Sequence, residues 1–276
     1  MKSRSALYKL NLSGKHDYFY TGKVEIENVH FHECAIICLN DAQLVLKFDD
    51  TQKKNIQPHS ICYISKNTIV DIVLYKTSKG IPYYIYNIDN DMLNSIYSAM
   101  TPLLLISTQN TLKKYKIFSF VADNVDKKIF NLLIMENIPR HRKIYKIAYL
   151  LSKFNNIESL MYSLSTAKYT TFSEKLTKII ESDISKTWNI SDFAKILHMS
   201  ESLIRKNLEK ENIKYNNLIK DIRMNHAFNL ILTTEKHINT ISREVGYAST
   251  SYFIHKFKKH YGITPKQFSI QVKNEL

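Results

Sequence analysis

The sequence predicts an α+β protein in which an antiparallel, β-rich half precedes an all-helical half. Up to about Ile88, short apolar runs rich in Val, Ile, Tyr and Phe recur at roughly 8–12-residue spacing, which is typical of antiparallel strands. From Asp89 onward, apolar residues recur every three or four positions, as they do along one face of a helix. The chain has 276 residues, of which 44% are hydrophobic, so it is long enough for two domains with separate cores.

The β-rich half is expected to form a small antiparallel barrel or sandwich. Its clearest strand candidates are Tyr18–Tyr20, Ala35–Leu39, Leu44–Phe48, Ile69–Tyr75 and Tyr83–Ile88. Flanking helices should follow, the first capped by Asp89 or Asn90, the second capped by Asp123, and the third beginning at Pro139. This third helix, to Phe154, has an apolar stripe that either packs against the strands or forms a dimerisation face.

Composition excludes several classes of protein. The net charge is +14, which favours a polyanionic partner, but residues 1–169 carry +8 and residues 170–276 carry +6, so charge alone identifies no binding domain. Only five glycines are present, and no dinucleotide-binding, phosphate-loop or nucleophile-elbow motif occurs. Three cysteines (Cys34, Cys38, Cys62) are too few for a disulfide framework and indicate reduced thiols in a cytoplasmic protein. We expect no signal peptide and no membrane span.

The helical half contains an internal repeat of about 48 residues. Apolar or small residues recur at an offset of 48 for five pairs and 49 for two more. The first copy comprises Ile190, Phe193, Ala194, Leu197, Met199, Ile204 and Leu208, and the second comprises Ile238, Ile241, Ser242, Val245, Tyr247, Phe253 and Phe257.

Each copy has the pattern of a helix-turn-helix motif. In the first copy, Ser191 is expected to cap a short helix and Ser200 a second helix that runs to about Glu211. In the second copy, a short helix should start at Asn239 and end at Gly246. Ser249 should then cap a helix that ends near Tyr261 and Gly262.

A continuous helix of about 17 residues, 216–232, is expected between the copies, with a length of about 25 Å. Such a spacer can hold two recognition helices about one DNA turn apart, so that one chain reads two successive major grooves. Many helical bundles contain one helix-turn-helix pattern by chance, but two copies in register favour DNA binding over a purely structural bundle.

Three segments within the second copy and after it resemble the signature of the AraC/XylS family of transcriptional regulators. They are Gly246–Phe253, Phe257–Lys258 and Tyr261–Phe268. The match covers residues 172–272, and the whole chain resembles the branch of the family that activates virulence genes. The resemblance implies a β-rich effector-binding or dimerisation domain with a cupin-like barrel at residues 1–165. It also implies a DNA-binding domain with two helix-turn-helix motifs at residues 172–276. The expected linker between the two domains is Leu164–Thr171, because this segment is polar and lacks strong periodicity.

The same resemblance implies a set of residues that contact DNA. The base-reading positions of the family fall on Ser202, Arg205, Lys206, Thr250, Ser251 and His255. Arg205 has the chemistry for bidentate contact with guanine, whereas Ile254 offers only apolar contact. Candidates for phosphate contact are Lys256, Lys258, Lys259 and Lys210, and the alternative for each is a plain solvated lysine.

Two hypotheses concern ligands of the β-rich half. His30, His32 and Cys34 would share one face of a continuous strand, which suits zinc or iron, although ordinary hydrogen-bonded histidines are the simpler interpretation. The family resemblance instead implies capture of a carboxylate effector, either a fatty acid or a small anion such as bicarbonate. The candidate effector-binding residues are Tyr18, Tyr20, Lys23 and His32.

The resulting expectation is a bacterial, cytoplasmic and nucleoid-associated activator of virulence genes. It would bind double-stranded promoter DNA and recruit RNA polymerase, as a monomer or a homodimer, with no catalytic residue, metal, cofactor or membrane contact. Two alternatives stay open. One is a metal-dependent enzyme built on the barrel and tethered to DNA, and the other is a DNA-binding repressor that needs no effector.

Overall fold

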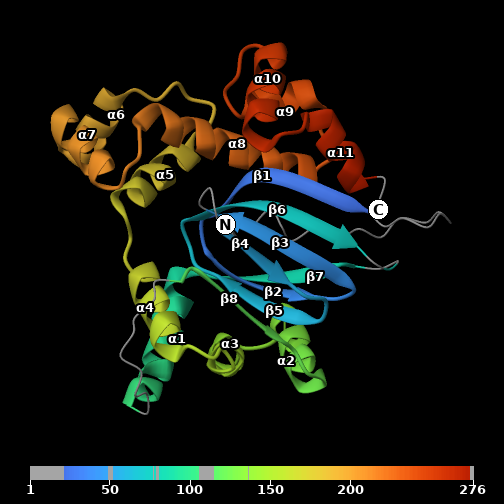
Figure 1. Cartoon of the computed structure of the whole chain (residues 1–276). Helices are drawn as coiled ribbons and strands as arrows, with labels where there is room; N and C mark the ends of the chain where they lie inside the picture. The colour runs from blue at the N-terminus through green and yellow to red at the C-terminus, as the bar shows by residue number, and fades with distance from the viewer. Residues whose placement is uncertain are drawn as a thin grey trace. The chain divides into compact units, whose positions relative to one another are not determined.

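The computed structural model describes residues 22–48, 52–76, 78, 81–105, 115–135 and 137–273. The chain divides into an N-terminal unit, which runs to Tyr169 and also includes the chain from Gln271 onward, and a C-terminal unit, Thr170–Ile270. Over the described residues the N-terminal unit contains eight strands and four α-helices, and all later elements are helices (Figure 1).

The strands of the N-terminal unit form two antiparallel sheets. One sheet has the order β1-β6-β3-β4 and the other the order β7-β2-β5-β8. The strands are β1 (Lys23–Phe31), β2 (Cys34–Leu39), β3 (Ala42–Phe48), β4 (Gln52–Ile56), β5 (Ser60–Ile64), β6 (Thr68–Lys76), β7 (Tyr83–Ile88) and β8 (Ile117–Val121). The expectation of antiparallel β structure is confirmed, but a closed barrel is wrong, because the strands described here pair into two sheets, each with two free edges.

Burial along the strands follows from the layers on either side of each sheet. Every residue of β2 and β5 is buried, since helices cover one face of their sheet (Figure 1) and the other sheet covers the opposite face. By contrast, β4 is largely exposed and contains two lysines, which discourages pairing at a sheet edge. One of them, Lys54, donates from Nζ to the carbonyl oxygen of Ile117 at 3.0 Å, so it links β4 to β8 across the two sheets.

The helices of the N-terminal unit pack against the β7-β2-β5-β8 sheet. They are α1 (Asn90–Met100), the 3-10 helix η2 (Thr101–Leu105), α2 (Asn124–Ile134), α3 (Arg140–Ser152) and α4 (Ile157–Ala167). The expected caps are confirmed, since Asp89 accepts from Met92 N–H and Asp123 from Val125 and Asp126 N–H. Pro139 lies at the N-cap of α3.

The apolar stripe of α3 packs in the core of the N-terminal unit. Ile147, Leu150 and Leu151 are fully buried in the cluster that joins the helices to β2 and β5. Tyr145, on the other side of α3, is 69% exposed. The stripe is therefore explained by core packing, the first of the two interpretations of this helix.

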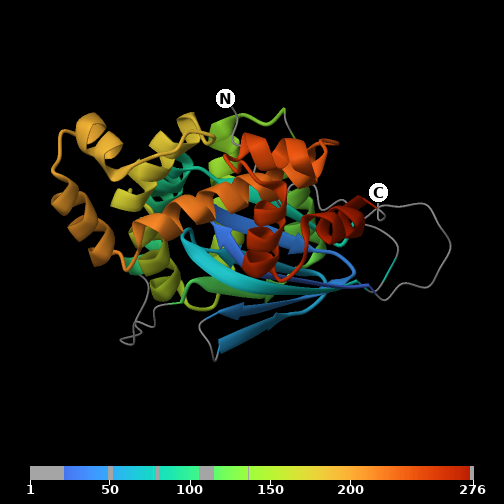
Figure 2. The ribbon, with the colours of Figure 1, turned by 90° about the horizontal axis from the view of Figure 1, so that it is seen from above.

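The C-terminal unit is built around one long helix, α8 (Tyr215–Thr233). Before it come α5 (Phe172–Ser182), α6 (Ile190–Leu197) and α7 (Glu201–Lys210), and after it come α9 (Ile238–Glu244), α10 (Thr250–Tyr261) and α11 (Pro265–Lys273). Two views show α8 running between the α6–α7 pair and the α9–α10 pair (Figures 1 and 2). Thr264 Oγ1 accepts from Gln267 N–H, so it caps α11, whose first residue is Pro265, as the sequence predicts.

Each helix-turn-helix pair packs on its own end of α8. Phe193, Ile204 and Leu208 form one apolar cluster with Leu218 and Ile222. At the other end, the aromatic rings of Phe228, Phe257, Tyr261 and Phe268 pack against one another. Trp188 packs against Phe193 with ring centroids 5.1 Å apart, so the prediction that it packs on the first motif is confirmed.

Three local boundaries differ from the sequence prediction. Helix α4 continues to Ala167, so the first half of the expected linker, Leu164–Ala167, is helical. Helix α6 starts after Asn189 rather than Ser191, because Asp192, three residues after Asn189, accepts from the Asn189 N–H at 2.9 Å. Helix α9 begins at Ile238, one residue before the expected Asn239.

Candidate nucleic-acid interface

The two repeats fold as two helix-turn-helix motifs. The first comprises α6 and α7, and the second comprises α9 and α10. Both turns need a residue in the left-handed backbone region, which is His198 (φ 52°) in the first motif and Gly246 (φ 81°) in the second. The side chains of Ser200 and Ser249 then accept from backbone N–H groups three residues ahead, both at 3.3 Å, which confirms them as caps of α7 and α10.

Helix α7 has an apolar buried face and a largely polar exposed face, which also includes Leu203. Ile204 and Leu208 are buried against α6 and α8. The three predicted DNA contacts of this motif, Ser202, Arg205 and Lys206, are all exposed, and so is Lys210. Ser202 Oγ lies 3.0 Å from Ser200 Oγ, so the first turn of α7 presents two hydroxyl groups beside its free N–H groups. The structure therefore brings these side chains together on one solvent-facing surface.

Helix α10 has the same division of faces. Phe253, Phe257 and Tyr261 are buried, and they hold the helix on α8 and α9. Ser251, His255, Lys258 and Lys259 are exposed, whereas Thr250, Ile254 and Lys256 are half-buried. No acidic residue occurs along α10, so its exposed face carries basic side chains and no carboxylate.

One exposed side chain of α10 was missed by the sequence analysis. Tyr252 is 53% exposed, and the ammonium group of Lys256 lies 5.0 Å from the centre of its ring. The sequence does contain a signal for its exposure, because Tyr252 does not share the helical spacing of the buried residues 253, 257 and 261. An aromatic ring with a cation on its face adds an apolar, positively charged contact to this surface.

The remaining histidine of α10 does not belong to the exposed face. His260 is largely buried beside α8, with Nδ1 3.8 Å from Asp221 Oδ1. Burial, with a smaller contribution from the nearby Lys220 ammonium, lowers the pKa of His260 to about 4. His260 is therefore neutral near pH 7 and adds no charge to the interface.

The two candidate ligand residues that the structure describes, Lys23 and His32, lie at opposite ends of β1. Lys23 Nζ pairs with Glu25 at 2.8 Å on the exposed face of β1. The rings of His30 and His32 lie 3.9 Å apart. Tyr18 and Tyr20 lie outside the described residues.

The expectation that His30, His32 and Cys34 share one strand face is wrong. Strand β1 ends at Phe31, the chain bends at His32, and Cys34 starts β2. Cys34 is buried, and its Sγ lies within hydrogen-bond distance (3.2 Å) of Tyr63 Oη. Among the residues that the structure describes, no group of three or more His, Cys, Asp or Glu side chains is placed to hold a metal ion.

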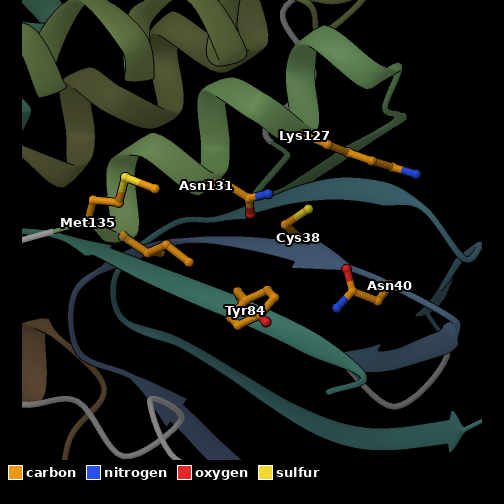
Figure 3. Close-up of a pocket in the computed structure, with 7 residues that line it drawn as sticks. Cys38, Asn40, Tyr84, Lys127, Asn131 and Met135 are labelled. Carbon is orange, nitrogen blue, oxygen red and sulfur yellow. The ribbon is translucent and has the colours of Figure 1, made fainter. Parts of the chain in front are cut away.

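A pocket of about 620 Å³ lies between α2 and the β2–β7 edge of the second sheet (Figure 3). Its lining combines apolar groups, polar groups and one cation: Cys38, Asn40, Tyr84, Lys127, Asn131, Ile134 and Met135. Burial raises the pKa of the Cys38 thiol to about 11, with a small opposing effect from Lys127. None of the described effector candidates lines this pocket.

No helix in the described part of the chain is both long and apolar enough to cross a membrane.

Two helix-turn-helix motifs on one connecting helix, each with exposed basic side chains on its second helix, define a DNA-binding regulator, and the comparisons agree. A family model described as a helix-turn-helix domain matches residues 193–270. The virulence regulon transcriptional activator VirF of Shigella flexneri is 33% identical over 261 residues, which cover 93% of this chain and 98% of VirF. The transcriptional activator FapR of Escherichia coli is 30% identical and covers 92% of this chain and 98% of its own length.

The fold has also been seen in a solved structure. ToxT from Vibrio cholerae superposes with a TM-score of 0.67 at 20% identity, covering 95% of this chain and 96% of ToxT. Together with the two relatives, this fold shows that the chain belongs to the AraC/XylS family of transcriptional regulators, among its activators of virulence genes.

Proposed function

We propose that the chain activates transcription of bacterial virulence genes by binding promoter DNA through both helix-turn-helix motifs. The observation that carries the proposal is the exposure of most predicted DNA contacts on α7 and α10, away from the buried apolar faces. The exposed ones are Ser202, Arg205, Lys206, Ser251, His255, Lys258 and Lys259. Helix α8, with 19 residues, is about 28 Å long. That length suits recognition helices in successive major grooves.

Base reading and phosphate binding are assigned to different side chains. Arg205 is the base reader of the first motif, because its guanidinium can donate two hydrogen bonds to guanine O6 and N7. Ser202, Lys206, Thr250, Ser251 and His255 complete the base-edge contacts. Lys256, Lys258 and Lys259 bind phosphates together with the free N–H groups at the start of α7 and α10.

The proposed setting is the bacterial cytoplasm, where the chain binds the nucleoid and recruits RNA polymerase as a monomer or a homodimer. The division of labour is also proposed, with residues 172–276 binding DNA and residues 1–165 sensing an effector or dimerising. No catalytic residue and no cofactor are part of the proposal.

Arg205→Ala and Lys258→Ala test the proposed roles. Arg205→Ala should weaken binding to the target promoter by about 1–3 kcal/mol and leave binding to random DNA nearly unchanged. Lys258→Ala should weaken binding to both DNAs alike and reduce the slope of log K against log salt by about 1. The measurement is fluorescence anisotropy on both DNAs over a range of salt concentration. Equal losses on random DNA for both variants would contradict the division of roles.

The effector is proposed to be a fatty acid or a small anion bound by the N-terminal unit. Support comes from a solved structure of ToxT from Vibrio cholerae, 22% identical to this chain, that holds an unsaturated fatty acid. The proposed carboxylate ligands are Lys23 and His32, with Tyr18 and Tyr20. Because Lys23 starts β1 and His32 follows its last residue, these two side chains are alternative ligands rather than joint ones. A carboxylate that binds Lys23 must displace Glu25, which already pairs with it.

Oleate and bicarbonate binding to three variants of the full chain would locate the effector. Either Lys23→Ala or His32→Ala should weaken binding, and the one that does identifies the end of β1 that holds the carboxylate. Lys127→Ala is the matched control, because it removes a lysine from the separate pocket of Figure 3. A loss of binding confined to Lys127→Ala would contradict the assignment to Lys23 and His32.

A further inference from the structure

Arg223 connects the two helix-turn-helix motifs through its guanidinium group. It projects from the middle of α8. Its Nη2 donates to the carbonyl oxygen of Lys186 at 2.9 Å, and its Nη1 donates to the carbonyl oxygen of Gly246 at 3.3 Å. Lys186 lies in the loop that leads into the first motif, and Gly246 lies in the turn of the second. One side chain thus links the loop before the first motif to the turn of the second motif.

The space for this guanidinium depends on the absence of a side chain at Gly246. A Cβ atom there would lie 2.7 Å from Arg223 Nη2 and 2.9 Å from the carbonyl oxygen of Ser185. The turn of the second motif therefore approaches the loop of the first motif closely, with Arg223 packed between them. The Tyr247 ring, 5.8 Å from the guanidinium carbon, closes one side of this space.

Both partners of Arg223 belong to well-fixed backbone. In the loop before the first motif, Lys186 N–H donates to Asp183 Oδ1, and Trp188 Nε1 donates to the carbonyl oxygen of Asp183. In the second motif, Tyr247 N–H donates to the carbonyl oxygen of Ser242, which ties the turn to α9. A hydrogen bond from Arg223 to each side therefore restrains one ordered body against the other rather than a loose segment.

We infer that Arg223 is a positioning residue that fixes the angle and spacing between the two recognition helices, and so sets the number of base pairs that the chain accepts between its two half-sites. The inference rests on the proposed function. Guanidinium geometry suits this role, since its N–H groups point in fixed, different directions. A lysine ammonium at the same position is a point charge at the end of a flexible chain and cannot restrain both carbonyl groups in one geometry.

DNA binding by full-length Arg223→Met, Arg223→Lys and wild-type chains tests the inference on three duplexes. One carries both half-sites at the natural spacing, one has a single inserted base pair between them, and one carries a single half-site. Wild type should bind the inserted duplex at least about tenfold more weakly than the natural one. Arg223→Met should bind the natural duplex about fivefold to tenfold more weakly than wild type and lose most of the discrimination against the insertion, with half-site binding unchanged. Arg223→Lys should not restore the discrimination.

Two other results would overturn the inference. One is full spacing discrimination in Arg223→Met. The other is an equal loss on the half-site and the full site, because that pattern indicates a direct DNA contact or general unfolding. If wild type binds no duplex specifically, the proposed function itself fails, which is a distinguishable result.

A distance measurement gives a readout that needs no DNA. Spin labels on Lys210→Cys in α7 and Lys259→Cys in α10, both exposed, report the separation of the two recognition helices, and the three native cysteines are buried. The distance distribution should be narrow with Arg223 and clearly broader with Arg223→Met, at unchanged helix content. An unchanged distribution would overturn the inference.

Discussion

Gly246 combines two constraints that no other residue type meets. Its φ of 81° disfavours any side chain, and a Cβ would collide with Arg223 and with the Ser185 backbone. We expect Gly246→Ala to destabilise the C-terminal unit by about 3 kcal/mol or more, because the strain of about 1 kcal/mol adds to a displaced guanidinium. Denaturant unfolding measures the change. Gly262→Ala is the control, since Gly262 has a similar φ of 79° but is exposed, and it should lose only about 1 kcal/mol.

His260 should make the C-terminal unit less stable in mild acid. Its pKa is about 4 in the folded chain, against 6.5 for an ordinary histidine, because burial disfavours the imidazolium. The unfolded chain therefore takes up the proton first as the pH falls below 6.5, and stability is lost between pH 6.5 and pH 4. Burial also lowers the pKa of His226, which acts in the same direction. The raised pKa of Asp221 acts in the opposite direction, near the lower end of this range.

The expected loss from His260 is about 2 kcal/mol between pH 7 and pH 5. Urea unfolding at a series of pH values measures it, and His260→Gln should flatten the dependence. His255→Gln, at an exposed histidine of the same helix, is the control and should leave the slope unchanged. An equal slope in wild type and His260→Gln would exclude His260 as the cause.

Local signals explain why the sequence predicts most helices of this protein. An N-cap and the residue three positions later lie within one turn, so Asp89, Asp123, Ser200 and Ser249 could be assigned from the sequence alone. The start of α6 was misplaced because Ser191 and Asn189 are both good capping residues. Asn189 is the N-cap because the Asp192 carboxylate accepts from its N–H. The spacing of three residues between Asn189 and Asp192 is also visible in the sequence.

The misplaced linker has a different cause. Residues 163–166 are mostly polar, yet Ser159 and Ser163 of α4 are buried in the N-terminal unit. A serine can face the core where a helix covers a sheet. Its polarity then interrupts the regular spacing of apolar residues by which a helix is recognised in the sequence. Polar composition alone therefore gave a linker that began too early.

Substitutions at the N-cap of a recognition helix can distinguish effects on stability from effects on DNA binding. Ser249→Ala removes the acceptor for the Tyr252 N–H and should cost about 1 kcal/mol of stability. Ser249→Asp should retain the cap and the stability, but its negative charge at the start of α10 should weaken DNA binding severalfold by repelling phosphate. Thermal melting and anisotropy measure the two effects. Undiminished DNA affinity in Ser249→Asp would mean that the start of α10 does not approach the phosphate backbone.

At the scale of the whole molecule, the sequence predicts less of the structure. Strand pairing and side-chain contacts there join residues that are far apart along the chain. Alternating apolar runs predict antiparallel strands, but whether strands close a barrel or form two sheets depends on which edges meet, as at β1 and β4. The outer faces of α7 and α10 follow from helical periodicity. The contacts of Arg223 do not, since Lys186 and Gly246 are 37 and 23 residues away along the chain. A contact of that kind appears only in the folded structure.

The division into two units predicts that DNA binding and effector sensing can be separated. Both helix-turn-helix motifs, the connecting helix α8 and both aromatic and aliphatic clusters that support them lie within Thr170–Ile270. We therefore expect the fragment Phe172–Leu276 to unfold cooperatively by itself and to bind the target promoter. Its slope of log K against log salt should match that of the full chain, because the phosphate contacts are the same.

Oleate or bicarbonate should change the promoter affinity of the full chain and leave that of the fragment unchanged, as anisotropy titrations with and without the effector would measure. An effector response in the fragment would instead place the ligand in the C-terminal unit, and a fragment that folds without binding promoter DNA would contradict the assignment of DNA binding to residues 172–276.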